Sequence, residues 1–147
     1  HLLFQEIREG TLKGVSMAET LRQSTRLMHP QFRNIHNKIF GGYLMREAFE
    51  LAWNITYLFC GHRPHFLSFD HMYFYEPVEI GSILSFTGQV IYTSPRALMV
   101  EVTVEVIDPA SGITEVTNVS YFTFTVLDKA GNSLKINQVL LSLMKKV

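Results

Sequence analysis

The stretch from Arg33 to Gly42 carries the side chains and backbone best suited to chemistry in this sequence. Asn34 precedes the pair Gly41-Gly42, and a long apolar run begins directly after the pair. Glycines allow a ligand or another backbone to come close, and the first amides of a helix have no acceptor within it. Such amides can polarise a carbonyl oxygen or hold an anion. The same glycines could instead serve only a tight turn and close helix packing.

The side chain of Asn34 is neutral, which limits the chemistry open to it. Its amide can orient a water molecule or donate to a carbonyl oxygen, but it cannot act as a general base. In a loop, an asparagine more often forms an Asx turn. Spacing alone does not decide between the two roles of Asn34.

Other candidate groups follow weaker patterns. Cys60, His62 and His65 lie close together in the sequence, but they make a thin ligand set, so we expect no metal site. A hydratase or dehydratase would need a histidine paired with a carboxylate, and His36 lacks that setting. Asp70 falls in an alternating strand pattern, which favours a hydrogen-bonding role over acid catalysis.

A long helix is predicted to follow the glycine pair, from Gly42 to Phe59. Its strongly polar side chains fall, at about 100° per residue, in one sector roughly a third of the circumference wide. They are Arg46, Glu47, Glu50 and Asn54. Nearly all the remaining helix surface is apolar, so we expect a sheet to wrap around it. Gly61 predicts the end of the helix.

Apolar and polar residues alternate with a period of two in four later segments, which predicts strands. The expected strands are 67–76, 84–92, 100–106 and 120–126, with 19–28 as a first strand and 137–146 as a short closing helix. Turn residues at 94–95, 108–112 and 128–131 separate them. One helix followed by closely spaced strands predicts an α+β fold, with an antiparallel sheet wrapped around one long central helix.

Length and composition narrow the class of protein. The 147 residues fit a single domain, and 13 Lys plus Arg balance 13 Asp plus Glu, so no net charge attracts nucleic acid. The single cysteine excludes an intrachain disulfide. No apolar run reaches the length of about 18 residues that a membrane span needs. The apolar fraction of 47% is enough for a core and a further contact surface, so we expect association.

Two motifs resemble the signatures of the hotdog-fold acyl-CoA thioesterases. Asn34-x-x-Asn37-x-x-Phe40-Gly-Gly42 is similar to their Asn-x-x-Gly-x-x-Phe/His-Gly-Gly pattern, and Asp70-x-x-x-Phe74-x-x-Pro77-Val78-x-x-Gly81 is similar to their next signature. The resemblance covers about 19–126 and is strongest to members with tandem hotdogs. It implies one hotdog domain over 1–147, hydrolysis of fatty acyl-CoA to free acid and CoA, no metal or redox cofactor, and a mitochondrial location.

The resemblance also implies roles for particular residues. Asn34 and the Gly42 amide would hold the thioester carbonyl and a water molecule, with Phe40 and Gly41 in the same substrate-binding segment. An aspartate on a facing hotdog would activate the water. Arg96-Ala97-Leu98-Met99 stands where the family often has a Ser-Ser-Met sequence that helps hold CoA, so the CoA contacts would differ, and Arg96 could contact a phosphate.

One departure from the family pattern concerns the base. Phe49 occupies the helix position of the family aspartate, and Glu50 is turned away from that position by about 100°. We therefore expect one repeat of a tandem protein, with a second hotdog domain that supplies the acid, in a homo-oligomer. The isolated chain should hydrolyse acyl-CoA poorly. The alternative is a non-catalytic hotdog that binds acyl-CoA or only provides an oligomer interface.

Overall fold

The computed structural model describes residues 10, 13–28, 38–39, 41–74, 78–79 and 81–141. Asn34, His36, Asn37 and Phe40 lie outside this part of the chain. The elements, in chain order, are β1 (Lys13–Ser16), η1 (Met17–Thr20), β2 (Arg22–Leu27), β3 (Lys38–Ile39), α2 (Gly41–Cys60), β4 (Arg63–Phe74), β5 (Val78–Glu79), β6 (Ile83–Thr93), β7 (Leu98–Ile107), β8 (Thr114–Leu127) and β9 (Gln138–Leu141).

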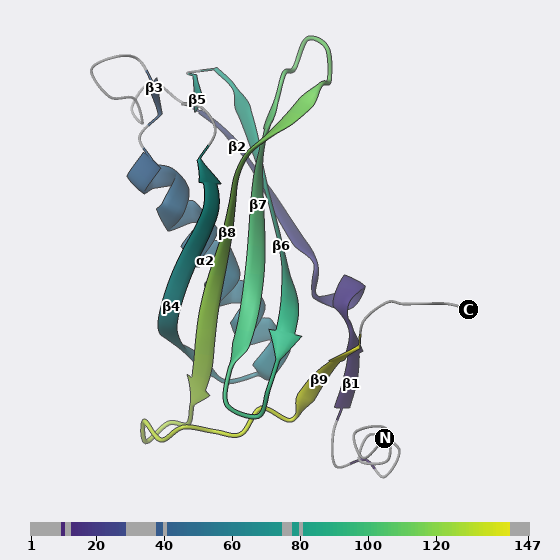
Figure 1. The fold of residues 1–147 in the computed structure, drawn as a ribbon, viewed down its shortest axis with the longest axis vertical. Coiled ribbons are helices and arrows are strands. Elements are labelled where there is room, and N and C mark those ends of the chain that lie inside the picture. The colour runs from purple at the N-terminus through teal and green to yellow at the C-terminus, as the bar shows by residue number, and fades with distance from the viewer. Residues whose placement is uncertain are drawn as a thin grey trace.

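A five-stranded antiparallel sheet lies along one side of α2 (Figure 1). Its strand order is β2-β6-β7-β8-β4, so β2 and β4 form the two edges. The side chains of β7 alternate between the two faces: Val100, Val102 and Val104 are buried, whereas Glu101 and Glu105 are half-buried on the outer face. The predicted α+β arrangement of one helix and an antiparallel sheet is confirmed.

The helix packs closely on the centre of the sheet. Leu44, Ala48, Ala52 and Ile55 are at most 2% exposed, and they share the face of α2 that meets the strands. Opposite them, a Cβ placed on Gly88 of β6 would come within 2.6 Å of the Ile55 Cδ1. The absence of a side chain at Gly88 therefore sets how closely α2 approaches the sheet.

Most predicted elements are confirmed, with boundaries that differ by a few residues. The predicted helix 42–59 is Gly41–Cys60, and it ends at Gly61, whose φ is 71° and whose amide donates to the Tyr57 carbonyl. The four expected strands are β4, β6, β7 and β8. The expected first strand, 19–28, begins as the 3-10 helix η1 and becomes β2. The predicted turns follow β6, β7 and β8.

The closing helix expected over 137–146 is wrong where the structure describes it. Gln138–Leu141 is the strand β9, which pairs in parallel with β1. This leucine-rich segment has some helix propensity, but it pairs with a strand from the other end of the chain. Tertiary pairing overrides such a weak local preference. The preceding residue Ile136 is only 4% exposed, and its amide donates to the Pro95 carbonyl, which directs the chain toward β1.

The helix is less enclosed than the sequence led us to expect. The sheet covers one side of α2, while Tyr57 remains 44% and Leu58 65% exposed. The five strands cover only part of the circumference of α2, so a single chain leaves apolar surface of this helix uncovered. No helix in the described segments is long and apolar enough to cross a membrane.

Candidate active site

The glycine pair lies at the start of α2, as predicted. Just before the pair, β3 forms a short antiparallel ladder with β5, in which Ile39 faces Val78. This ladder anchors the chain where it enters the helix. Gly42 is exposed, so its backbone can be approached from solvent. The predicted roles of Asn34 and Phe40 remain predictions, because both residues lie outside the described segments.

Charged and polar groups surround the first turns of the helix. Arg26 Nε of β2 lies 3.3 Å from Glu47 Oε2, and this ion pair joins the edge strand to α2. The pKa of Tyr43 is raised, first by burial and then by the neighbouring Glu47 carboxylate. The Tyr43 phenol therefore stays protonated at neutral pH. Tyr43 was not among the residues predicted from the sequence. The only feature of the sequence that points to it is its position directly after Gly42.

Phe49 belongs to an aromatic cluster between α2 and the sheet. Its ring centroid lies 5.5 Å from that of Phe66, 5.9 Å from that of Phe122 and 5.9 Å from that of Phe124. Phe69 extends the cluster, with its centroid 5.2 Å from that of Phe122. Phe66 and Phe122 meet the Phe49 ring edge to face, and such pairs stabilise beyond the area they bury. The position where the family pattern has an aspartate is thus packed with rings and carries no proton-transfer group.

Glu50 is the acidic residue next to this cluster in sequence. It is exposed, like Arg46 and Asn54, in agreement with the predicted polar stripe. Glu50 also lines a depression of about 270 Å³ together with Phe49, Trp53 and Asn54. Two of the four lining residues are aromatic, and one of them, Trp53, contacts Tyr57 with ring centroids 5.4 Å apart. This depression lies on the side of the helix that the sheet leaves uncovered.

The structure does not bring Arg96 together with Gly42 within one chain. Arg96 is exposed in the turn between β6 and β7, where the Ala97 amide donates to Ser94 Oγ at 3.1 Å. That turn lies at the end of the sheet where α2 ends (Figure 1). The 20 residues of α2 separate the two places by about 30 Å. Within one chain, Arg96 and Gly42 therefore cannot contact the same group of a ligand.

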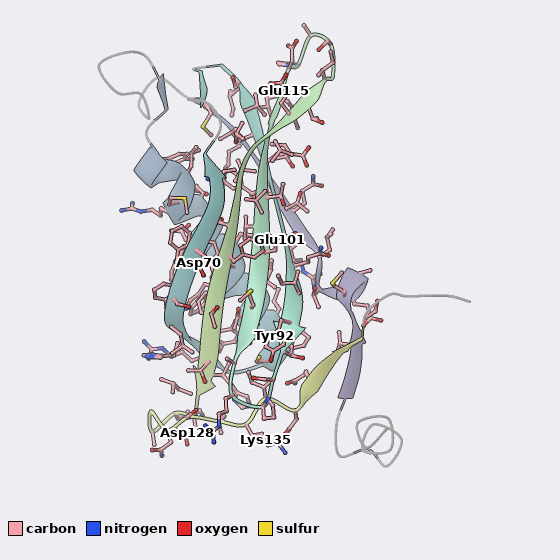
Figure 2. The ribbon with its side chains drawn as sticks, viewed as in Figure 1. Asp70, Tyr92, Glu101, Glu115, Asp128 and Lys135 are labelled. Atoms are coloured by element: carbon pink, nitrogen blue, oxygen red, sulfur yellow. The ribbon has the colours of Figure 1, made fainter. Side chains whose placement is uncertain are left out.

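Two other candidates lie away from the helix start. Asp70 pairs in register with Tyr121, which in turn faces Glu101, so these residues lie on the outer face of the sheet (Figure 2). This position separates Asp70 from α2 and agrees with a non-catalytic role.

Burial raises the pKa of the Cys60 thiol to about 12. Among the described residues, no three His, Cys, Asp or Glu side chains are grouped as metal ligands.

Comparisons with known proteins place the chain among thioesterases. No family model matches it. Acyl-coenzyme A thioesterase 9, mitochondrial, of Mus musculus is 44% identical over 112 residues, which are 76% of this chain and 26% of that protein. Acyl-coenzyme A thioesterase 2, chloroplastic, of Humulus lupulus is 39% identical over 121 residues, or 79% of this chain and 28% of that protein. The chain thus spans about a quarter of these relatives.

A solved structure agrees in fold. The acyl-CoA hydrolase from Staphylococcus aureus, in complex with butyryl coenzyme A, coenzyme A and coenzyme A disulfide, has a TM-score of 0.83 and 26% sequence identity; the match covers 90% of this chain and 80% of that chain. Among the members with tandem hotdogs, the sequence motifs predict the strongest likeness to the second hotdog repeat of mitochondrial acyl-coenzyme A thioesterase 9. The likeness to that protein is confirmed, whereas the assignment to its second repeat stays a prediction. Sequence, strand order and the helix that starts at the glycine pair agree: this chain has the hotdog fold and is similar, over about three quarters of its length, to acyl-CoA thioesterases.

Proposed function

We propose that this chain provides half of a site that hydrolyses fatty acyl-CoA to free fatty acid and CoA. The observation that carries the proposal is the 44% identity to a thioesterase over three quarters of the chain. In the reaction, water adds to the thioester carbonyl and the carbon–sulfur bond breaks. CoA then leaves as a thiol, which takes up the proton that water loses. No metal or redox cofactor is needed.

Asn34 and the Gly42 amide are the groups that we assign to this half. Both would donate hydrogen bonds to the carbonyl oxygen as negative charge develops on it, with Gly41 and Phe40 beside the acyl group. Helix amides without an intrahelical acceptor suit this task. The base must come from a second hotdog domain, because Phe49 is packed among Phe66, Phe122 and Phe124 and cannot accept a proton.

We propose that the second hotdog docks along the open edge of β4. That edge carries exposed apolar side chains: Phe66 is 43%, Leu67 50% and Phe69 37% exposed. The opposite edge, β2, carries exposed Arg22 and Arg26, which are charges of the kind that discourage strand pairing, and one exposed apolar side chain, Leu27. The edge with more exposed apolar surface, β4, therefore fits a partner sheet better.

The uncovered side of α2 supports the same docking site. Trp53 and Tyr57 lie on it, and Phe49, which lines the same depression as Trp53, contacts Phe66 of β4. A partner hotdog paired at β4 would bring its own helix against these rings and complete the enclosure that one chain lacks. Pairing of two like domains about a two-fold axis uses the same surface on both, so a homo-oligomer follows by the same contacts.

The test of the proposed function compares three proteins with a fatty acyl-CoA as substrate and release of free thiol as readout. The full-length tandem protein should turn over. Its Asn34→Ala variant should lose about 10²- to 10³-fold in rate, as expected when one donor to an oxyanion is removed. The isolated 147-residue chain should hydrolyse poorly, because its pairs contain no base. Robust turnover by the isolated chain would refute this division of labour.

The non-catalytic alternative has one observation in its favour, the aromatic cluster at Phe49. It predicts that Asn34→Ala leaves turnover of the full-length protein unchanged. If that variant also binds acyl-CoA normally, the chain provides only an interface.

We propose a mitochondrial location for the protein, because three of the similar thioesterases are named as mitochondrial. A relative of similar identity is named chloroplastic, so plastids are the other outcome. Fractionation of cells that express the full-length protein, followed by immunodetection, distinguishes the two. Recovery in neither organelle would contradict the proposal.

A further inference from the structure

An ion pair ties the edge strand β2 to the helix that begins at the glycine pair. Arg26 Nε of β2 lies 3.3 Å from Glu47 Oε2 of α2. Arg26 pairs in register with the buried Leu84, so it lies on the sheet face that meets α2. The Glu47 side chain is only 17% exposed, whereas that of Arg26 is 53% exposed. The Glu47 carboxylate is therefore largely shielded from water, and Arg26 offsets its charge.

Glu47 lies near the beginning of α2. It follows Gly42 by five residues, which correspond to about 7.5 Å along the helix axis. It follows Tyr43 by four residues, so these two side chains share one face of the helix. The pKa of Tyr43 is raised first by burial and then by the Glu47 carboxylate, and it is lowered by Arg26, so all three groups are close. The ion pair thus meets α2 in the turns that follow the Gly42 amide.

The end of β2 is fixed at a second place, two residues beyond Arg26. Met28 is 1% exposed, and its amide donates to the Ser82 carbonyl at 2.9 Å. The Met28 carbonyl accepts a hydrogen bond from the Gly81 amide at 3.0 Å. Gly81 and Ser82 come directly after β5, and β5 pairs with β3 just before the glycine pair. The end of β2 is therefore connected to the start of α2 through the backbone as well.

These contacts form a closed frame at the end of the molecule where α2 begins (Figure 1). The frame runs from β2 through the contacts of Met28 to β5, across to β3, into α2, and back to β2 through the ion pair. The segment that carries Asn34 begins after Met28 and ends at Lys38 of β3, so both of its ends are attached to the frame. Gly42 also belongs to the frame. Both groups that we assign to the half-site therefore depend on it.

We propose that Arg26 and Glu47 are positioning residues, which hold the start of α2 so that the Gly42 amide is aimed at the thioester carbonyl. This role rests on the proposed function. A donor stabilises the oxyanion only if it is already directed to the place where charge develops. A displacement of about 1 Å in such a site can cost about 10²-fold in rate. Partly exposed ion pairs contribute little to stability, so the effect belongs to the rate and not to folding.

The experiment measures kcat and KM of the full-length protein with a fatty acyl-CoA, and its urea unfolding. Arg26→Gln removes the cation, Arg26→Lys keeps the charge, and Arg26→Gln/Glu47→Gln removes both partners. The control Arg22→Gln removes one charge from another exposed position of β2, where the guanidinium donates to the Glu19 and Leu21 carbonyls. A second measurement, ¹⁵N relaxation of the 147-residue chain, gives the order parameter of the Gly42 amide and needs no substrate.

We expect Arg26→Gln to lower kcat about tenfold, less than the 10²- to 10³-fold loss for removing a donor, because the Gly42 amide is loosened and not lost. KM and the urea midpoint should stay close to those of the parent. Arg26→Lys should retain most of kcat, and the double variant should be no slower than Arg26→Gln, since the two residues act as one unit. The order parameter of the Gly42 amide should fall from about 0.85 to below about 0.6 in Arg26→Gln.

Equal losses of kcat in Arg26→Gln and in the control Arg22→Gln would overturn the proposal, because they would show a general effect of charge. A fall in kcat that comes with an earlier urea midpoint would also overturn it, because the ion pair would then act through folding. If the full-length parent shows no turnover, the proposed function fails. The Gly42 order parameter then decides the positioning role, which is refuted if Arg26→Gln leaves that value unchanged.

Discussion

Phe49 shows how one residue changes what a hotdog domain can contribute. In the family pattern its position belongs to an acid, but here the ring contacts Phe66, Phe122 and Phe124. A carboxylate in the same place would need a partner or water to offset its desolvation. The aromatic replacement therefore gains packing and gives up the proton acceptor, so the proposed function needs a base from a partner domain.

Phe49→Ala tests how much the cluster contributes to stability. The variant removes a half-buried ring that three others contact, so we expect a loss of about 2–4 kcal/mol in the free energy of unfolding, toward the lower part of the range for aromatic-to-alanine changes. Phe49→Leu keeps most of the volume and should lose about half as much. Urea unfolding followed by circular dichroism measures both. If Phe49→Ala unfolds at the parent's midpoint, the cluster is not a stabilising contact.

Among the elements, α2 and the long strands could be predicted from the sequence, because their patterns are local. A run of apolar residues with one polar sector identifies α2, and strict alternation identifies β7. The strand β9 could not be predicted, because it forms only by pairing with β1 from the far end of the chain. The same dependence on distant contacts limits how well the site could be predicted. The glycine pair marks the helix start locally, whereas the distance of Arg96 from it depends on how the strands fold back.

The contact between Gly88 and Ile55 tests the packing of α2 on β6. A methyl group added at position 88 would lie 2.6 Å from Ile55 Cδ1 and 3.4 Å from Leu51 Cδ2. Because Ile55 is 2% exposed, it has little room to move. We expect Gly88→Ala to lose about 1–3 kcal/mol by overpacking. Adding Ile55→Val removes Cδ1, so the double variant should be more stable than the sum of the single losses predicts. Strictly additive losses in urea unfolding would contradict this contact.

At the scale of the whole molecule, the two edges of the sheet differ in kind. Arg22 and Arg26 lie exposed on β2, whereas β4 exposes Phe66, Leu67 and Phe69 beside the uncovered rings of α2. Exposed apolar surface along an open strand edge is costly for a monomer in water. Covering it would complete the core around α2 and bring together the two half-sites of the proposed function.

Leu67→Lys tests whether β4 is the docking edge without disturbing the aromatic cluster. Leu67 is 50% exposed, so a lysine there can stay solvated in a single chain, but it would be buried or repelled by its counterpart in a pair. We expect sedimentation velocity to show the parent chain as a dimer or larger at micromolar concentration and Leu67→Lys shifted toward monomer. Ile113→Lys is the matched control, because Ile113 is 63% exposed in the β7–β8 connection, away from the proposed edge. If Ile113→Lys dissociates the assembly and Leu67→Lys does not, the partner docks on another surface than the edge of β4.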